Sequence, residues 1–137
     1  MSNRSNILRR AGMALLAALM CLTAFAADKG EAAITLASKS YDFGNIRESA
    51  GPVTTEFEFV NTGDAPLVII SAVASCGCTR PVYPQAPVKP GKSGKIKVTF
   101  LPQGRPGEFS KTIKVRTNAK KNKKFTLRIS GVVIPKD

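Results

Sequence analysis

Residues 53–64 read Val-Thr-Thr-Glu-Phe-Glu-Phe-Val-Asn-Thr-Gly-Asp. Apolar and polar side chains alternate along this stretch, with Phe57 and Phe59 in one phase and Glu56 and Glu58 in the other. Alternation with a period of two is typical of a strand that buries one face. The stretch ends in Asn-Thr-Gly-Asp, which favours a turn. It therefore predicts one strand of a β-sheet followed by a sharp reversal of the chain.

The same pattern recurs on both sides of this stretch, separated by Gly, Pro and Asn. The expected strands are residues 33–36, 41–43, 53–60, 67–73, 95–100, 109–115 and 125–133. Residues 67–73 are more continuously apolar, as expected for a strand covered on both sides. The inward positions of the later strands are Ile96, Val98, Phe100, Phe125, Leu127 and Ile129. About seven short strands with turns at short intervals predict an all-β, immunoglobulin-like antiparallel β-sandwich.

The N-terminus has the three parts of an export signal. Residues 1–10 hold three arginines and no acid, residues 11–22 are apolar, and Ala24-Phe25-Ala26 offers a cleavage point. The apolar run is shorter than the ~20 residues needed to span a bilayer. Cys21 follows Met20, without the small residue that a lipoprotein signal places there. We therefore expect a cleavable signal peptide at 1–26, a lead-in with a first strand at 27–40, and the sandwich domain at 41–137.

Export follows from this prediction. The mature protein is expected in the periplasm or outside the cell, including the periphery of a membrane, without a transmembrane anchor.

The composition of the chain argues against catalysis. None of its 137 residues is His, so it lacks an ordinary catalytic triad and a side chain that shuttles protons at neutral pH. Its glycines are expected at turns, and no Gly-rich phosphate loop or cluster of metal ligands is apparent. The sequence predicts a protein that is not an enzyme and has no cofactor.

Charge is unevenly distributed along the chain. Residues 27–79 hold three basic and seven acidic side chains, whereas residues 80–137 hold fifteen basic and two acidic ones. Many of the bases fall in the polar phase of the later strands or in the turn between the last two. The candidates for binding an anion or a partner are Lys95, Lys97, Lys114, Arg116, Lys120, Lys121, Lys123 and Arg128. If the last two strands pair, Lys114, Arg116 and Arg128 share one surface.

Two interpretations of these bases remain open. They form a solvated face that keeps the protein soluble and discourages pairing of sheet edges, or they attract an anionic partner. Phospholipid, envelope polysaccharide and an acidic envelope protein are the anionic partners expected. Nucleic acid is not expected, because the protein is exported and its basic strands lack interleaved aromatic residues that stack on bases. The oligomeric state is left open.

Residues 75–79 read Ser-Cys-Gly-Cys-Thr and hold both cysteines found after position 26. In an oxidising compartment two such cysteines usually pair, and Gly77 offers the backbone freedom that a small ring needs. Four interpretations stay open for Cys76 and Cys78: a structural disulfide, a redox-responsive pair, a pair of Cu(I) ligands, and disulfides between chains. As metal ligands they are weak candidates, since no His or Met would complete the site.

Several segments of the chain resemble a known bacterial family. They are Tyr41-Asp42-Phe43-Gly44-Asn45-Ile46, Phe57 to Gly63, Pro66 to Ile69, Ser75 to Thr79, Pro90 to Gly94, Val98 to Phe100, Gly107 to Lys111 and Val115 to Asn118. Together they resemble the family called domain of unknown function 1573, over nearly all of residues 41–134. That family is similar to the immunoglobulin-like domains of the major-sperm-protein, ASH and Hydin group. The resemblance implies this fold and a place in the bacterial envelope, but no activity.

We therefore expect an exported, non-enzymatic binding or scaffolding module of the bacterial cell envelope. It would contact partners through its basic strand face and exposed sheet edges. The alternative function is a periplasmic thiol-redox or Cu(I)-handling protein that uses Cys76 and Cys78.

Overall fold

The structure is a computed structural model that describes residues 30–136. The predicted signal peptide at 1–26 lies outside the described residues. The described chain folds into eight strands and one short 3-10 helix. These elements are β1 (Ile34–Leu36), β2 (Ser40–Arg47), η1 (Glu48–Ala50), β3 (Val53–Asn61), β4 (Ile69–Ala74), β5 (Thr79–Val82), β6 (Ser93–Phe100), β7 (Gly107–Thr117) and β8 (Lys124–Ile134).

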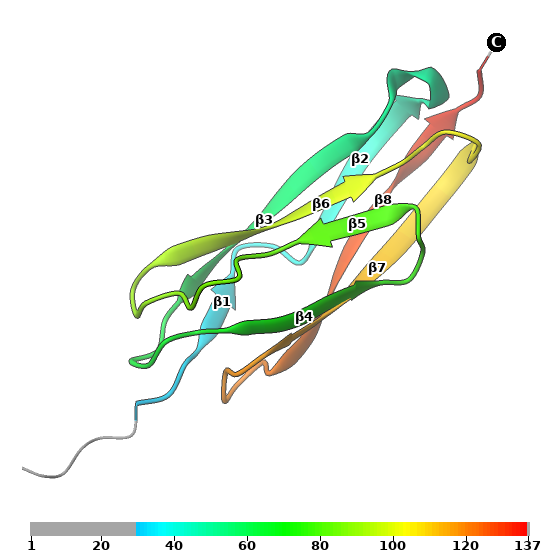
Figure 1. The fold of residues 1–137 in the computed structure, drawn as a ribbon. Helices are drawn as coiled ribbons and strands as arrows, with labels where there is room; N and C mark the ends of the chain where they lie inside the picture. Colours follow the sequence, from blue (N-terminus) through cyan, green and yellow to red (C-terminus); the bar gives the residue numbers. More distant parts are fainter. Residues whose placement is uncertain (1–29, 137) are drawn as a thin grey trace, which may run out of the picture.

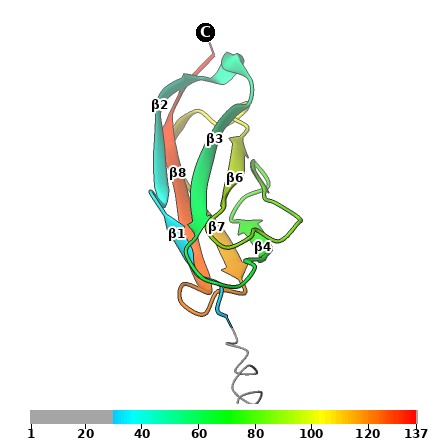
Figure 2. The ribbon, with the colours of Figure 1, turned by 90° about the vertical axis from the view of Figure 1, so that its left-hand side faces the viewer.

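The strands form two four-stranded sheets packed face to face, as Figures 1 and 2 show. The strand order is β1-β3-β6-β5 in one sheet and β2-β8-β7-β4 in the other. The hairpin turn between β7 and β8 lies at one end of the sandwich, and the C-terminus lies at the other (Figure 1). The predicted immunoglobulin-like β-sandwich is confirmed. One pairing departs from antiparallel geometry, because β2 runs parallel to β8.

The core consists of the side chains predicted to point inward. All eight of them (Phe57, Phe59, Ile96, Val98, Phe100, Phe125, Leu127 and Ile129) are buried. They face one another between the sheets because successive side chains of a strand point to opposite sides. The rings of Phe100 and Phe109, from different sheets, stack with their centroids 4.0 Å apart. Glu56 and Glu58 lie in the exposed phase of β3, as predicted.

Residues 79–82 form an additional strand that the sequence pattern did not reveal. They fall between the expected strands 67–73 and 95–100, but they make β5, which pairs with β6. Two features hid this strand: it has only four residues, and one of them is Pro81. Proline lacks the N–H that a central strand needs, but β5 lies at a sheet edge, where one side of the backbone has no partner strand.

The prediction for residues 67–73 was wrong. They were expected to be covered on both sides, but β4 is the edge strand next to β7. Ile70 and Val73 are 48% and 63% exposed. A run of apolar residues indicates burial on both faces only when the strand is central, and the sequence does not give the position of a strand within its sheet.

Asn61 fixes the reversal that follows β3. Its side chain is fully buried. The Nδ2 amide donates to the carbonyl oxygens of Ala65 and Val88 at 2.8 and 2.9 Å, and Oδ1 accepts the N–H of Gly63 at 3.0 Å. The turn predicted at 61–64 is therefore held from inside the domain by this one amide.

Candidate functional site

The outer face of the β2-β8-β7-β4 sheet carries a cluster of exposed bases. β7 and β8 pair so that Arg116 lies opposite Lys124, Lys114 opposite Thr126 and Thr112 opposite Arg128. Lys114, Arg116, Lys124 and Arg128 are all exposed and all point away from the core. We call these four residues the cationic face. The prediction that Lys114, Arg116 and Arg128 share one surface is confirmed, and the pairing adds Lys124, which was absent from the predicted site.

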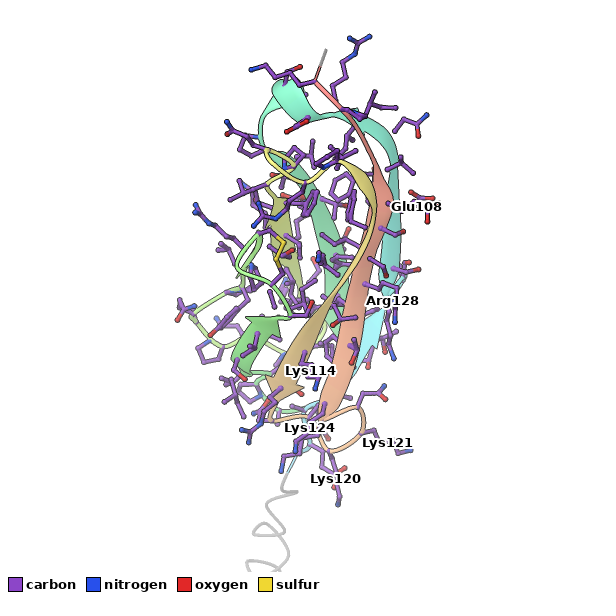
Figure 3. The ribbon with its side chains drawn as sticks, turned by 90° about the vertical axis from the view of Figure 1, so that its right-hand side faces the viewer. Glu108, Lys114, Lys120, Lys121, Lys124 and Arg128 are labelled. Atoms are coloured by element: carbon purple, nitrogen blue, oxygen red, sulfur yellow. A yellow bond between two sulfur atoms is a disulfide. The ribbon has the colours of Figure 1, made fainter. Side chains whose placement is uncertain are left out.

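The cationic face occupies one part of its sheet. Figure 3 shows Lys114, Lys124 and Arg128 along β7 and β8, while Glu108 lies toward the other end of β7. Asp42, on the neighbouring strand β2, pairs with Ser130, so it lies diagonal to Arg128 and farther from the hairpin turn. Within residues 30–136, ion pairs join Lys95 to Glu56 and Lys120 to Glu31, and neither involves the cationic face. Positive charge is thus concentrated toward the hairpin end of this sheet.

Lys95 and Lys97 lie elsewhere. They belong to β6 in the other sheet, so their exposed side chains point from the opposite side of the sandwich. There Lys95 lies opposite Glu58 and Lys97 opposite Glu56, and Lys95 also forms an ion pair with Glu56 at 3.3 Å. The acids of β3 balance the bases of β6 on this face. The eight predicted bases are therefore divided among several surfaces, and no acid lies directly opposite a member of the cationic face.

The remaining three predicted bases lie in the turn between β7 and β8. Lys120, Lys121 and Lys123 are exposed there. Lys120 Nζ donates to Glu31 Oε1 at 2.6 Å, and this hydrogen bond and charge raise the pKa of the Lys120 amine. Lys120 is thus paired to the segment that precedes β1. Lys121 and Lys123 extend the positive charge of the cationic face beyond the ends of the strands.

An apolar edge borders the cationic face. Val73 of β4 lies opposite Lys114, and the exposed Ile70 belongs to the same strand. β4 pairs only with β7, so the other side of its backbone has no strand partner among the described residues. This border combines exposed hydrophobic side chains, unpaired backbone groups and adjacent positive charge. Such edges can accept an additional strand.

Cys76 and Cys78 lie where the chain passes from one sheet to the other. They are joined by a disulfide, with Cα atoms 5.2 Å apart. β4 ends at Ala74 in one sheet and β5 begins at Thr79 in the other, so the disulfide spans the crossover. Cys78 is fully buried and Cys76 is partly exposed. The N–H of Leu101 donates to the carbonyl of Cys78 at 2.9 Å, which anchors the crossover to the end of β6.

Gly77, between the two cysteines, does not have the conformation that usually demands glycine. Its φ lies outside the left-handed region, whereas five other glycines have positive φ. A Cβ built at Gly77 would have nothing within 4 Å. Neither the backbone angle nor a neighbouring atom of the described residues therefore requires glycine here.

Two further searches bear on other site types. The described residues contain no group of three or more His, Cys, Asp and Glu side chains arranged to hold a metal ion. Within the same residues no helix has the length and apolar character needed to cross a membrane.

Two packed sheets with this strand order define the protein as an immunoglobulin-like sandwich. The chain belongs to the family described as "Protein of unknown function (DUF1573)", whose profile matches residues 34–133. The resemblance deduced from the sequence is confirmed. The family description assigns no activity. None of the curated proteins matches the sequence.

Several solved structures share the fold. A protein of unknown function from Porphyromonas gingivalis W83 is 18% identical with a TM-score of 0.66, and the match covers 74% of this chain and 46% of that one. The ASH/PapD-like domain 7 of human CEP192 is 16% identical with a TM-score of 0.59, over 78% and 89% of the two chains. The periplasmic chaperone SfaE is 12% identical with a TM-score of 0.51, over 77% and 59%.

At these identities the likeness is one of fold alone. The chain spans less than half the length of the Porphyromonas gingivalis protein. The similarity to an ASH domain agrees with the relationship that the family resemblance implied.

Proposed function

We propose that this chain is an exported, non-enzymatic binding or scaffolding module of the bacterial cell envelope. Residues 1–26 would be removed as a signal peptide, and the cationic face would attach the mature domain to an anionic envelope component. The similarity to a periplasmic chaperone and to an ASH domain supports a fold suited to binding. That support is one of analogy, because folds host many functions.

The observation that carries the proposal is the pairing of Arg116 with Lys124. Like charges directly opposite each other on a sheet are destabilising. On the other sheet of the same domain, bases lie opposite acids. This domain pairs bases with acids on one outer face and leaves like charges opposite each other on the second. The repulsion on the second face lowers stability, and an anionic partner would offset it. A solvated face that only maintains solubility does not need its bases opposite one another.

The exposed residues beside the cationic face suggest how a partner would be held. Val73 and Ile70 offer apolar contact next to Lys114. An acidic protein segment that adds to the β4 edge would satisfy both, and so would the boundary between anionic headgroups and acyl chains of a membrane. Both partners belong to the envelope, and both would bind less tightly as salt increases.

The test uses full-length protein secreted by a bacterial host and recovered from the periplasm. Its intact mass would report cleavage after Ala26. Binding to phosphatidylglycerol vesicles, to phosphatidylcholine vesicles and to solubilised envelope proteins would be measured at low and high salt. We expect salt-sensitive binding to anionic vesicles or to acidic envelope proteins, and none to phosphatidylcholine.

A matched pair of double variants separates the cationic face from net charge. Arg116→Gln with Lys124→Gln removes two charges from the cationic face, and Lys95→Gln with Lys97→Gln removes two from the other sheet. We expect the first double variant to lose about tenfold or more in affinity at low salt and the second to lose little. Equal losses in both variants, or binding that does not weaken with salt, would contradict the proposal.

A further inference from the structure

We propose that the Cys76–Cys78 disulfide is a thiol–disulfide exchange site, in which Cys76 receives the thiol of a partner and Lys111 stabilises the Cys76 thiolate released in the second step. This activity goes beyond the proposed binding function and does not depend on it. The substrate would be two thiols that become a disulfide. They belong either to one protein dithiol or to two molecules of a small thiol.

Access distinguishes the two sulfurs. Cys78 is fully buried, whereas Cys76 is partly exposed at the crossover between the sheets. Thiol–disulfide exchange needs a thiolate to approach one sulfur, so access selects Cys76 as the atom attacked. The open space beside Gly77, where an added Cβ meets no atom within 4 Å, leaves room for that approach. A glycine that the domain itself does not require would then serve the incoming partner.

Hydrogen bonds are in place for both sulfurs once the bond between them breaks. The N–H of Cys78 donates to Cys76 Sγ at 3.1 Å. Cys78 Sγ lies 3.7 Å from the hydroxyl of Thr79, which can donate to it. Hydrogen bonds to the charged form of a group favour that form, so each sulfur has a donor that would stabilise its thiolate.

The β4–β7 pairing brings Lys111 to the same place. Ala74 lies opposite Ile113, and the N–H of Ser75 donates to the carbonyl of Thr112 at 2.9 Å. The next residues along the two chains are Cys76 and Lys111. Lys111 is partly buried and shares the inward phase of β7 with the buried Ile113. A charged lysine amine in the inward phase lowers the stability of the fold unless the amine reaches water or a negative charge.

The charged residues around the crossover favour a negative sulfur. The elements that meet here carry Arg80 on β5, Arg105 in the loop after β6, and Glu108 and Lys111 on β7. Glu108 is exposed and lies in the outward phase. Glu48 of η1 also meets the loop after β6, where its Oε1 accepts the N–H of Gly104 at 2.9 Å. Lys111 lies in the inward phase of β7, and no acid of β7 shares that phase. A cysteine near a lysine forms its thiolate more readily than an isolated one.

The exchange proceeds in two balanced steps. A partner thiolate attacks Cys76 Sγ, which forms a mixed disulfide and breaks the Cys76–Cys78 bond, and Cys78 leaves as a thiolate that takes up a proton. A second partner thiolate then attacks the partner's sulfur in the mixed disulfide and releases Cys76 as a thiolate, which also takes up a proton to complete the dithiol. The partner loses two electrons and two protons and becomes a disulfide, and this chain becomes a dithiol.

The first test measures the thiolate. Full-length protein is reduced, and alkylation by iodoacetamide is followed by peptide mapping from acidic to basic pH, in wild type and in two variants. We expect Cys76 to react before Cys78. Lys111→Met should slow alkylation of Cys76 at neutral pH about 3- to 10-fold and move its pH profile upward. Lys89→Met, which removes an exposed lysine from the connection between β5 and β6, should change neither.

Some results would overturn the proposal. Equal alkylation of Cys76 and Cys78 would remove the basis for selecting Cys76, and identical pH profiles for Lys111→Met and wild type would remove the role of Lys111. Circular dichroism of the reduced protein checks that it stays folded. If it unfolds, the oxidised protein is used instead. The rates at which glutathione and reduced thioredoxin reduce the disulfide of wild type, Lys111→Met and Lys89→Met then replace alkylation as the measurement.

The second test separates the two sources of thiol. Reduction of the disulfide by glutathione is compared with reduction by a reduced thioredoxin, in wild type and in Gly77→Leu. If the substrate is a protein dithiol, the leucine should slow thioredoxin at least several-fold more than glutathione. If Gly77→Leu slows reduction by both agents equally and only slightly, the substrate is a small thiol. A disulfide that neither agent reduces in the folded protein would contradict exchange altogether. Anionic binding is not measured here, so failure of this proposal leaves the cationic face untouched.

Discussion

Arg116 and Lys124 lie directly opposite each other at the end of the β7–β8 pair, and both side chains are exposed. The same pair of charges affects both the stability of the domain and its proposed binding to anions. Two positive charges in facing positions repel each other, so the hairpin would be more stable with an acid at one of them. Stability and anion binding are therefore expected to change in opposite directions when this pair is altered.

The first prediction concerns Lys124→Glu. The new carboxylate lies opposite Arg116, and exchange of repulsion for attraction should stabilise the domain by about 0.5–1 kcal/mol at low salt. The same variant should bind anionic vesicles more weakly than wild type. Urea unfolding and vesicle sedimentation measure the two effects.

Lys97→Glu is the control for this variant. It makes the same change of charge on the other sheet, where Lys97 lies opposite Glu56. It should destabilise the domain slightly and leave vesicle binding close to wild type. A Lys124→Glu variant that is both more stable and equally able to bind would show that the cationic face is not the attachment surface.

The second prediction concerns the buried amide of Asn61. Asn61→Ala would leave the carbonyl of Ala65 and the N–H of Gly63 without their partner, and the carbonyl of Val88 would keep only the N–H of Leu67. The expected loss of stability is about 2–4 kcal/mol, because buried polar groups left unpaired carry their full desolvation penalty. Chemical denaturation measures it.

Asn118→Ala provides a graded comparison with Asn61→Ala. Asn118 also makes two side-chain hydrogen bonds, to Val68 N–H and to the Pro66 carbonyl, but it is exposed, so water can replace them. Its loss should be about 1 kcal/mol. Similar losses in both variants would mean that burial does not set the importance of Asn61.

The sequence was sufficient to predict most of the fold. The inward positions of β3, β6 and β8 alternate strictly with polar residues, so burial of one face was visible in the pattern. The pattern did not reveal the order of the strands within each sheet. β4 is an edge strand although it is rich in apolar residues, and β5 contains Pro81 although it is a strand. Which strands lie at an edge depends on long-range pairing, which local periodicity does not encode.

The site was predicted less completely, for the same reason. The sequence indicated that the bases are exposed, but it could not assign Lys95 and Lys97 to a different sheet from Lys114 and Arg116. It also could not bring Lys111 to the crossover that holds Cys76, because that placement follows from extending the β4–β7 register by two residues. The position of a residue within a strand predicts which face of the sheet its side chain is on. Its neighbours on that face depend on how the strands pair.

The third prediction concerns Lys120 and Glu31. The hydrogen bond and charge of Glu31 raise the pKa of the Lys120 amine, so its proton is held more tightly in the folded state. The contribution of this pair to stability is complete below the unfolded pKa of lysine and is lost as the pH rises through the higher folded value. NMR titration of the lysine side chains should find Lys120 deprotonating at higher pH than it does in Glu31→Gln. Identical titration of Lys120 in both proteins would contradict the pairing.

The fourth prediction concerns Gly94 and Phe59. The glycines of this chain were expected at turns, but Gly94 lies within β6, directly opposite Phe59. A Cβ built at Gly94 would lie 2.5 Å from Cζ of the Phe59 ring, which is fully buried. The ring thus occupies the space that a side chain at position 94 would need, and the glycine is required for this packing.

Gly94→Ala should therefore destabilise the domain by about 1–3 kcal/mol, as overpacking of a core does. Gly77→Ala is the matched control, because its added methyl group meets no atom within 4 Å, and it should change stability by about 0.5 kcal/mol at most. Combining Gly94→Ala with Phe59→Leu should cost less than the sum of the two single losses, since the smaller side chain relieves the clash. Additive losses in urea unfolding would show that position 94 acts independently of the Phe59 ring, and the steric explanation would then be wrong.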